Sequence, residues 1–198
     1  YRPPLPTKGN IYEEARYYVV SNGRATGVEH SCAYNKDGKL LFTASGTVDS
    51  INYDEKYLKL LEANPGSVLY HNHPSGATLS IDDFCFSAKY KLEKIIAFGT
   101  TEEAEYAGRA LINEGGILFD VVKKSISPHI FKHFRAAYDA GKMSREDGNI
   151  LLSHLRNEIL KSQKMVEYEI VKPGKITAEI IKKYKDFIKE IVESYGKG

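Results

Sequence analysis

Leu69-Tyr70-His71-Asn72-His73-Pro74-Ser75-Gly76-Ala77-Thr78-Leu79-Ser80-Ile81-Asp82-Asp83 is the stretch on which the fold and the chemistry depend. Side chains alternate between the two faces of a strand, so the two histidines of a His-x-His pair project from the same face. Two neutral imidazoles and one carboxylate suit a zinc ion that keeps its fourth position open to water. The stretch therefore predicts a strand, a turn-rich loop and a helix around a metal site.

Each part of this stretch also has a simpler interpretation. A single histidine at a surface is usually just solvated, and Ser80-x-x-Asp83 fits a capping box at the start of a helix. The conjunction of all these residues at fixed spacing favours the metal site. The capping interpretation is compatible with it, because a capped helix N-terminus would hold Asp83 rigidly toward the metal.

The composition is that of an ordinary globular protein. Of the 198 residues, 42% are hydrophobic and 27% are charged, and no run of about 18 apolar residues predicts a membrane span. The formal charge of +2 is too small to indicate a nucleic-acid surface by itself. The two cysteines, Cys32 and Cys85, give no disulfide framework and are expected to be small core residues. A reducing, cytoplasmic location is the expectation. The start at Tyr1 predicts processing or excision from a larger or secreted polypeptide.

Around this stretch the pattern alternates between strands and helices. The proline-rich residues 1–9 are expected to form an extended lead-in. Helices are predicted at 11–20 (broken by Ser21-Asn22-Gly23), 54–63, 84–92, 128–140, 144–164 and 177–195, and strands at 28–34, 39–43, 67–71, 94–98, 105–112 and 117–122.

Hairpins mixed with helical crossovers predict an α/β fold in which helices flank a mixed sheet. We expect a lead-in and helix at 1–24, a catalytic domain at 25–123 and a C-terminal helical extension at 124–198.

The motif His71-x-His73-Pro74, followed by Ser80-x-x-Asp83, resembles the signature of the JAMM, or MPN/JAB, zinc metalloproteases. The hexapeptide at 71–76, HNHPSG, is similar to the version in RadC-type bacterial proteins. The short loop before Ser80 resembles JAB-like domains of phage head-morphogenesis proteins and bacterial toxins. The resemblance covers roughly residues 25–110, and it implies an MPN/JAB-like fold with cytidine-deaminase-like layering.

The resemblance also implies a role for each site residue. His71, His73 and Asp83 would bind Zn²⁺, and Ser80 would hydrogen-bond the oxyanion. An upstream acid on a strand that crosses the site would be the general base, and Glu29 is the best match. Glu13 and Glu14, on a predicted helix, are the alternatives for the base. Because the loop is short, Asp82 competes for the ligand role, although the Ser-x-x-Asp register favours Asp83.

The remaining histidines give weaker patterns. His129 and His133 are four apart on a predicted helix, but the glutamate of a His-Glu-x-x-His site is absent, so no second metal site is expected there. His30 should point away from Glu29 on a regular strand, and His154 has no evident partner in the sequence.

The function expected from the resemblance is that of a zinc metallopeptidase, an isopeptidase or deubiquitinase-like enzyme. Its substrate would be a protein or peptide, such as ubiquitin or a ubiquitin-like protein, or a larger phage or toxin polypeptide that it processes. The alternatives are a non-catalytic JAB-fold binding or assembly module and a RadC-like protein with a nucleic-acid-related role. The lysines near the C-terminus alternate with acidic residues, which favours a solvated face over a nucleic-acid surface.

Overall fold

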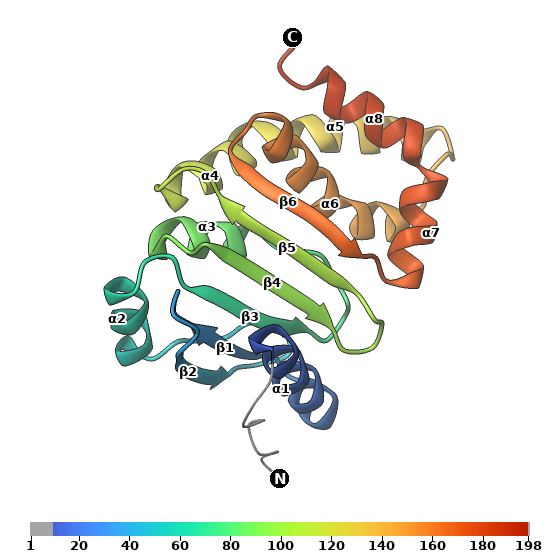
Figure 1. Ribbon diagram of the computed structural model, residues 1–198. Helices are drawn as coiled ribbons and strands as arrows, with labels where there is room; N and C mark the ends of the chain where they lie inside the picture. The colour runs from blue at the N-terminus through green and yellow to red at the C-terminus, as the bar shows by residue number, and fades with distance from the viewer. Residues whose placement is uncertain (1–9, 198) are drawn as a thin grey trace.

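A six-stranded mixed sheet in the order β2-β1-β3-β4-β5-β6 forms the centre of the computed structural model, which describes residues 10–197 (Figure 1). The lead-in predicted for residues 1–9 lies outside the described residues. β3 and β4 are parallel, and the other neighbouring pairs are antiparallel. The strands are β1 (His30–Tyr34), β2 (Leu40–Ser45), β3 (Val68–His73), β4 (Lys94–Gly99), β5 (Glu105–Ala110) and β6 (Val166–Lys172).

Helices cover both faces of this sheet, which confirms the predicted α/β class with its C-terminal helices (Figure 1). The predicted elements not discussed below are present, with ends displaced by at most three residues. The helices are α1 (Ile11–Thr26), α2 (Glu55–Ala63), α3 (Ile81–Tyr90), α4 (Gly115–Val121), α5 (Ser127–Asp139), α6 (Arg145–Ser162), α7 (Lys175–Lys183) and α8 (Lys185–Ser194), with a π-helical segment η1 (Val122–Ile126).

The two faces of the sheet carry separate apolar clusters because successive side chains alternate between them. On one face Cys32, Tyr70 and Phe98 pack in the same cluster as Ala15 and Val19 of α1. On the other face the larger core includes α3 and the C-terminal helices, and its sheet members include Ala33, Leu69, Ile95, Ala97 and Tyr106. The odd-numbered residues of β3, including both motif histidines, therefore belong to the face opposite α1.

The first helix is longer than the sequence predicts. α1 begins after Asn10, whose side chain accepts a hydrogen bond from the Tyr12 N–H, and it ends at Gly27, where φ is 72°. The predicted break at Ser21-Asn22-Gly23 is wrong, since the helix continues through it. Gly23 has a packing role there, because a Cβ atom at this position would lie 2.5 Å from the Asn72 amide nitrogen. The glycine lets α1 approach β3.

The predicted strand at 117–122 is also wrong. α4, η1 and α5 follow one another without a break from Gly115 to Asp139, and the predicted boundary between 123 and 124 falls inside this run. The physical reason is visible in the buried side chains: Leu118, Val122, Ile126 and Ile130 recur every four residues, which is the spacing of a helix face.

The C-terminal segment adds a strand as well as helices. β6, which the sequence interpretation missed, pairs antiparallel with β5 and extends the sheet. The single helix predicted at 177–195 is two helices, α7 and α8, which meet at Tyr184. None of the helices described within residues 10–197 is long and apolar enough to cross a membrane. The segment after residue 124 is thus built into the sheet and its helical cover.

Candidate metal centre

The two motif histidines lie at the end of β3, inside the sheet. His71 pairs with Ser31 of β1 and with Ala97 of β4, so its backbone is held on both sides. The side chains of His71 and His73 lie on the same face, are 3% and 8% exposed, and bring their Nε2 atoms within 2.8 Å of each other. The strand therefore presents two imidazole nitrogens at one point.

Asp83 completes the group from the first turn of α3. Its Oδ1 lies 3.3 Å from the Nε2 of His71, and its Oδ2 lies 3.7 Å from the Nε2 of His73. A capping box holds this carboxylate: the Ser80 N–H donates to Asp83 Oδ2 at 2.7 Å, and the Ser80 hydroxyl oxygen accepts from the Asp83 N–H at 3.1 Å. Asp82, by contrast, is exposed and does not belong to the group.

The three side chains could hold a metal ion. Their ligand atoms lie within 4.8 Å of one another, and they form the one such group of three found in residues 10–197. In a tetrahedral zinc site with bonds near 2.0–2.2 Å, neighbouring ligand atoms lie about 3.4 Å apart. The two Nε2 atoms are 2.8 Å apart, and they lie 3.3 and 3.7 Å from the two different oxygens of the Asp83 carboxylate.

A hydrogen bond from the loop fixes the orientation of one ligand. His73 Nδ1 lies 2.7 Å from the backbone oxygen of Ala77. A carbonyl oxygen can only accept, so Nδ1 carries the proton, and the neutral imidazole keeps its lone pair on Nε2, which faces the metal position.

The charges of the group are strongly coupled. Burial by itself would raise the pKa of Asp83, but His71, His73 and the Ser80 N–H hold that pKa well below its usual range. Burial opposes protonation of His71, yet Asp83 and Glu29 raise its pKa overall. The pKa of His73 is lowered by burial and by the neighbouring His71. Asp83 is therefore an ionised carboxylate at neutral pH, as a metal ligand must be.

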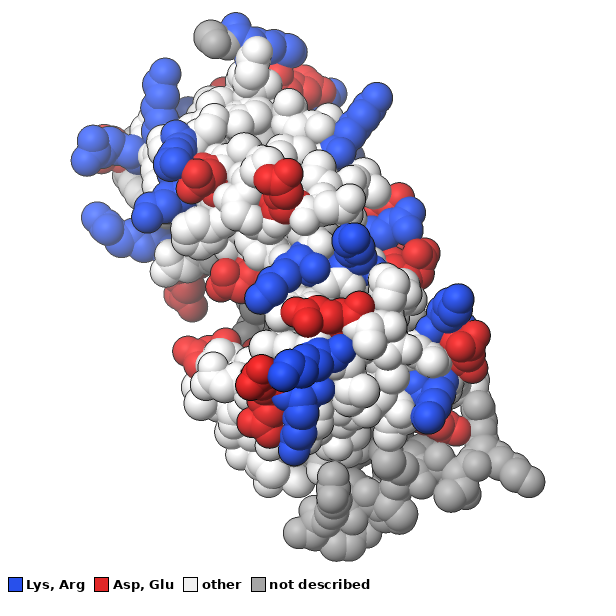
Figure 2. Space-filling view, turned by 90° about the vertical axis from the view of Figure 1, so that its left-hand side faces the viewer, with Lys and Arg blue, Asp and Glu red and all other residues white. Residues whose placement is uncertain are grey.

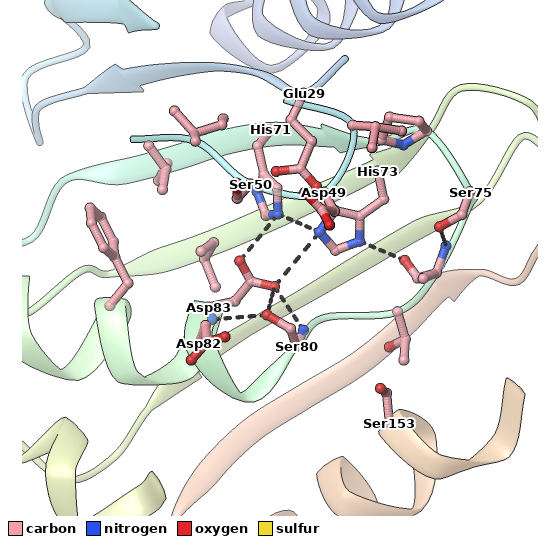
Figure 3. Close-up of a pocket in the computed structure, with 18 of the residues that line it drawn as sticks. Glu29, Asp49, Ser50, His71, His73, Ser75, Ser80, Asp82, Asp83 and Ser153 are labelled. Carbon is pink, nitrogen blue, oxygen red and sulfur yellow. Dashed lines mark hydrogen bonds and ion pairs between the residues drawn. The ribbon is translucent and has the colours of Figure 1, made fainter. Parts of the chain in front are cut away.

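Glu29, the residue directly before β1, also lies beside the two histidines and Asp83. Its backbone is fixed by the loop after β2, since its N–H donates to the Thr47 carbonyl at 2.7 Å and its carbonyl accepts from the Gly46 N–H at 2.9 Å. The side chain is 9% exposed and points into the cavity toward His71 (Figure 3). Burial raises its pKa to about 7, with His71 opposing the shift and Asp83 and Asp49 adding to it. The carboxyl group therefore titrates near neutral pH.

Asn72, which the sequence interpretation did not single out, ties Glu29 to the histidine strand. It is fully buried on the opposite face of the sheet. Its side-chain oxygen accepts from the His30 N–H at 2.7 Å, and its amide nitrogen donates to the Val28 carbonyl at 3.1 Å. These are the two residues that flank Glu29. The signal available in the sequence was the period of a strand, which sends the middle residue of His-x-His to the opposite face.

The alternative bases lie elsewhere. Glu13 and Glu14 are on α1, which packs in the cluster on the other face of the sheet, and neither lines the cavity around the histidines. His30 also lies on that face, where its Nε2 is 2.8 Å from the hydroxyl of Thr26.

The remaining histidines form no site of this kind. The rings of His129 and His133 are 4.9 Å apart, and His129 Nε2 lies 2.9 Å from the Ile191 carbonyl. No third ligand joins them among the described residues. His154 is buried, with Nδ1 at 3.4 Å from the hydroxyl of Tyr168.

The Ser80 hydroxyl has a partner within the site. It donates to Asp83 Oδ2 at 2.8 Å, so its proton is directed at the carboxylate (Figure 3). The oxyanion role predicted for Ser80 requires this hydrogen bond to break during the reaction.

A cavity of about 380 Å³ surrounds these side chains (Figure 3). Its walls include the loop after β2, with Val48, Asp49 and Ile51, and the loop after β3, with Ser75 and Thr78. Phe86 of α3, Ile95 of β4 and Ser153 of α6 also line it. The C-terminal segment thus lines the cavity together with the motif.

Comparisons of the chain with protein-family models, with curated proteins and with solved structures gave no match. The relation to JAMM metalloproteases therefore stays an expectation from the sequence, based on the motif at 71–83 and on Glu29.

Proposed function

We propose that the protein is a zinc-dependent hydrolase of peptide or isopeptide bonds, of the JAMM type. The observation that carries this proposal is the convergence of His71, His73 and Asp83 in a cavity into which Glu29 also points. The two imidazoles and one carboxylate match the ligands of catalytic zinc sites that keep a position open.

In this proposal each side chain has a separate task. Zinc, when bound, would supply a water of lowered pKa and polarise the carbonyl that is attacked. Glu29, with its pKa raised to about 7, accepts the proton of the attacking water and delivers it to the leaving nitrogen. The Ser80 hydroxyl, which donates a hydrogen bond to Asp83 Oδ2, donates it instead to the carbonyl oxygen as that oxygen gains negative charge.

The charge of the cavity favours an amide over a phosphodiester. Glu29, Asp49, Asp82 and Asp83 line it, and none of the described lining residues is a lysine or an arginine. Apart from the proposed zinc ion, a phosphate backbone would find none of the lysine or arginine side chains that normally neutralise it, whereas a peptide bond carries no charge. On the face seen in Figure 2, lysines and arginines gather at the upper left and lie among aspartates and glutamates elsewhere, so the charge of that face is mixed rather than uniformly basic.

The size of the cavity limits what part of a substrate can enter. A volume of about 380 Å³ is near the lower end for ligand sites, and it admits a side chain or a short extended segment. The proposed substrate is therefore a flexible peptide segment. The C-terminal tail of ubiquitin or of a ubiquitin-like protein fits this description, as does a processing site in a larger phage or toxin polypeptide.

Metal analysis and cleavage assays on the full chain test this proposal. We expect one zinc per chain by mass spectrometry, cleavage of ubiquitin chains or unstructured peptides, loss of cleavage with a chelator, and recovery on adding zinc. Iron in place of zinc would contradict it, because the same three residue types also bind Fe(II) in oxygenases. Bound zinc without cleavage, with chelation merely lowering the melting temperature, would instead indicate a non-catalytic module.

A further inference from the structure

The loop at 74–79, which joins the histidines to Ser80, is held by side chains from the C-terminal segment. Asn157 of α6 donates from its amide nitrogen to the Leu79 carbonyl at 2.8 Å. The hydroxyl of Tyr168, on β6, lies 2.6 Å from the hydroxyl of Thr78. These partners are 78 and 90 residues apart in the sequence. The loop of the motif is thus anchored from outside the motif.

The anchored loop residues are next to the atoms that orient the metal ligands. Ala77, whose carbonyl accepts the Nδ1 proton of His73, directly precedes Thr78. Leu79 directly precedes Ser80, whose backbone and hydroxyl hold the carboxylate of Asp83. A shift of the loop would therefore disturb both His73 and Asp83.

Asn157 is built to hold this position. It is 1% exposed, and its amide nitrogen is also 3.5 Å from the hydroxyl of Thr78. Removing the amide leaves the Leu79 carbonyl without its donor in a buried place, where an unpaired acceptor is costly. The loop is expected to move toward water in order to satisfy that carbonyl. The structure thereby couples α6 to the position of Ala77 and Ser80.

We propose that Asn157, with Tyr168, is a positioning residue for the metal ligands and acts through the loop at 74–79. The inference rests on the proposed metal-dependent function. On this view the C-terminal segment is part of the metal centre, and zinc affinity depends on residues that never touch the ion. Loss of a group that hydrogen-bonds a metal ligand directly typically costs about 10- to 100-fold in metal affinity, and Asn157 acts one contact further out, so the lower end of that range is expected.

The test is the zinc affinity of the full chain, measured by competition with a chromophoric chelator, together with the absorption spectrum of the cobalt-substituted protein. We expect Asn157→Ala to weaken zinc binding about 10-fold and to alter the cobalt spectrum. Tyr168→Phe, which removes one hydroxyl and keeps the ring, should weaken it by a smaller factor in a protein that still folds. Ile159→Val is the matched control, since Ile159 is fully buried on the same helix and belongs to the apolar core.

The outcomes separate this inference from the proposed function. If Asn157→Ala and Tyr168→Phe bind zinc within about twofold of the parent, the positioning role is wrong although the metal site stands. An equal loss in Ile159→Val would also overturn it, because the effect would then follow from destabilising α6. If Asn157→Ala does not fold, Tyr168→Phe decides the question alone. A parent chain that binds no zinc overturns both proposals.

Discussion

The side-chain oxygen of Asn72 accepts a hydrogen bond of 2.7 Å from the backbone N–H of His30, across the pairing of β1 with β3. Its amide nitrogen donates to the Val28 carbonyl, so one side chain spans Glu29. β3 therefore presents His71 and His73 on one face of the sheet and, through Asn72 on the opposite face, holds the backbone on both sides of Glu29. This geometry makes Asn72 part of what aims Glu29 into the cavity.

Replacing Asn72 with alanine should reduce cleavage without removing the metal. The change leaves the buried His30 N–H and the partly buried Val28 carbonyl without their partner, which is expected to cost about 1–3 kcal/mol in the free energy of unfolding. A base displaced by about 1 Å can lose about 100-fold in rate, so we expect kcat to fall about 10- to 100-fold. Steady-state kinetics, urea unfolding and zinc content measure the three quantities.

The matched control is Asn22→Ala, since Asn22 is also a buried asparagine, and it donates to the Tyr18 carbonyl within α1. It should lose stability with little loss of kcat. An equal loss of kcat in both variants would show that Asn72 has no special connection with Glu29.

Neighbouring aspartates give a sharp test of the ligand set. Asp83→Ala should abolish zinc binding, as should alanine at His71 or His73, because each removes one of the three ligand atoms. Asp82→Ala should keep it, since that side chain is exposed and outside the group. Zinc at 100 times its dissociation constant stabilises a folded protein by about 2.7 kcal/mol. Asp83→Ala should lose this stabilisation, and Asp82→Ala should keep it. Zinc lost from Asp82→Ala and kept in Asp83→Ala would refute the assignment.

Local rules predicted the central part of the site. The common face of His71 and His73 follows from the period of a strand, and the cap that joins Ser80 to Asp83 follows from helix-end chemistry. Both rules concern residues within three positions of each other, so they needed no knowledge of the rest of the fold.

The predictions failed where tertiary packing, rather than local sequence, determines the structure. Gly23 was interpreted as a helix break, but α1 continues through it. The glycine is needed for packing, since a side chain at this position would collide with Asn72. The run at 117–122 was interpreted as a strand because a short apolar run does not distinguish the two structures by itself. β6 could have been found, since Val166, Tyr168 and Ile170 alternate with glutamate and valine. The role of Asn157 could not be predicted from the sequence, because its partner is the backbone carbonyl of Leu79, and only the packing of α6 brings the two together.

Changing Glu29 to glutamine should separate proton transfer from metal binding. Glutamine keeps the size of the side chain but cannot accept a proton, and general-base catalysis typically contributes about 10²–10⁴-fold. We expect kcat to fall by that factor, while the zinc content is unchanged. Glu13→Gln, an exposed position on α1, is the control that should retain the parent rate. Cleavage at the parent rate by Glu29→Gln would exclude Glu29 as the base.

His154 should give the stability of the chain a dependence on acid pH. It is 6% exposed, and burial lowers its pKa to about 4. The unfolded histidine titrates near pH 6.5, so between about pH 6.5 and 4 the unfolded state binds the proton more readily than the folded state. The contribution of the neutral histidine is complete above pH 6.5 and is lost as the pH falls toward 4, by about 3 kcal/mol in total. Urea unfolding of the parent and of His154→Gln across this range measures it, because the other titrating groups are common to both. The free energy of unfolding of the parent should fall more steeply with acid than that of the variant, and parallel curves would mean that His154 is already solvated in the folded protein.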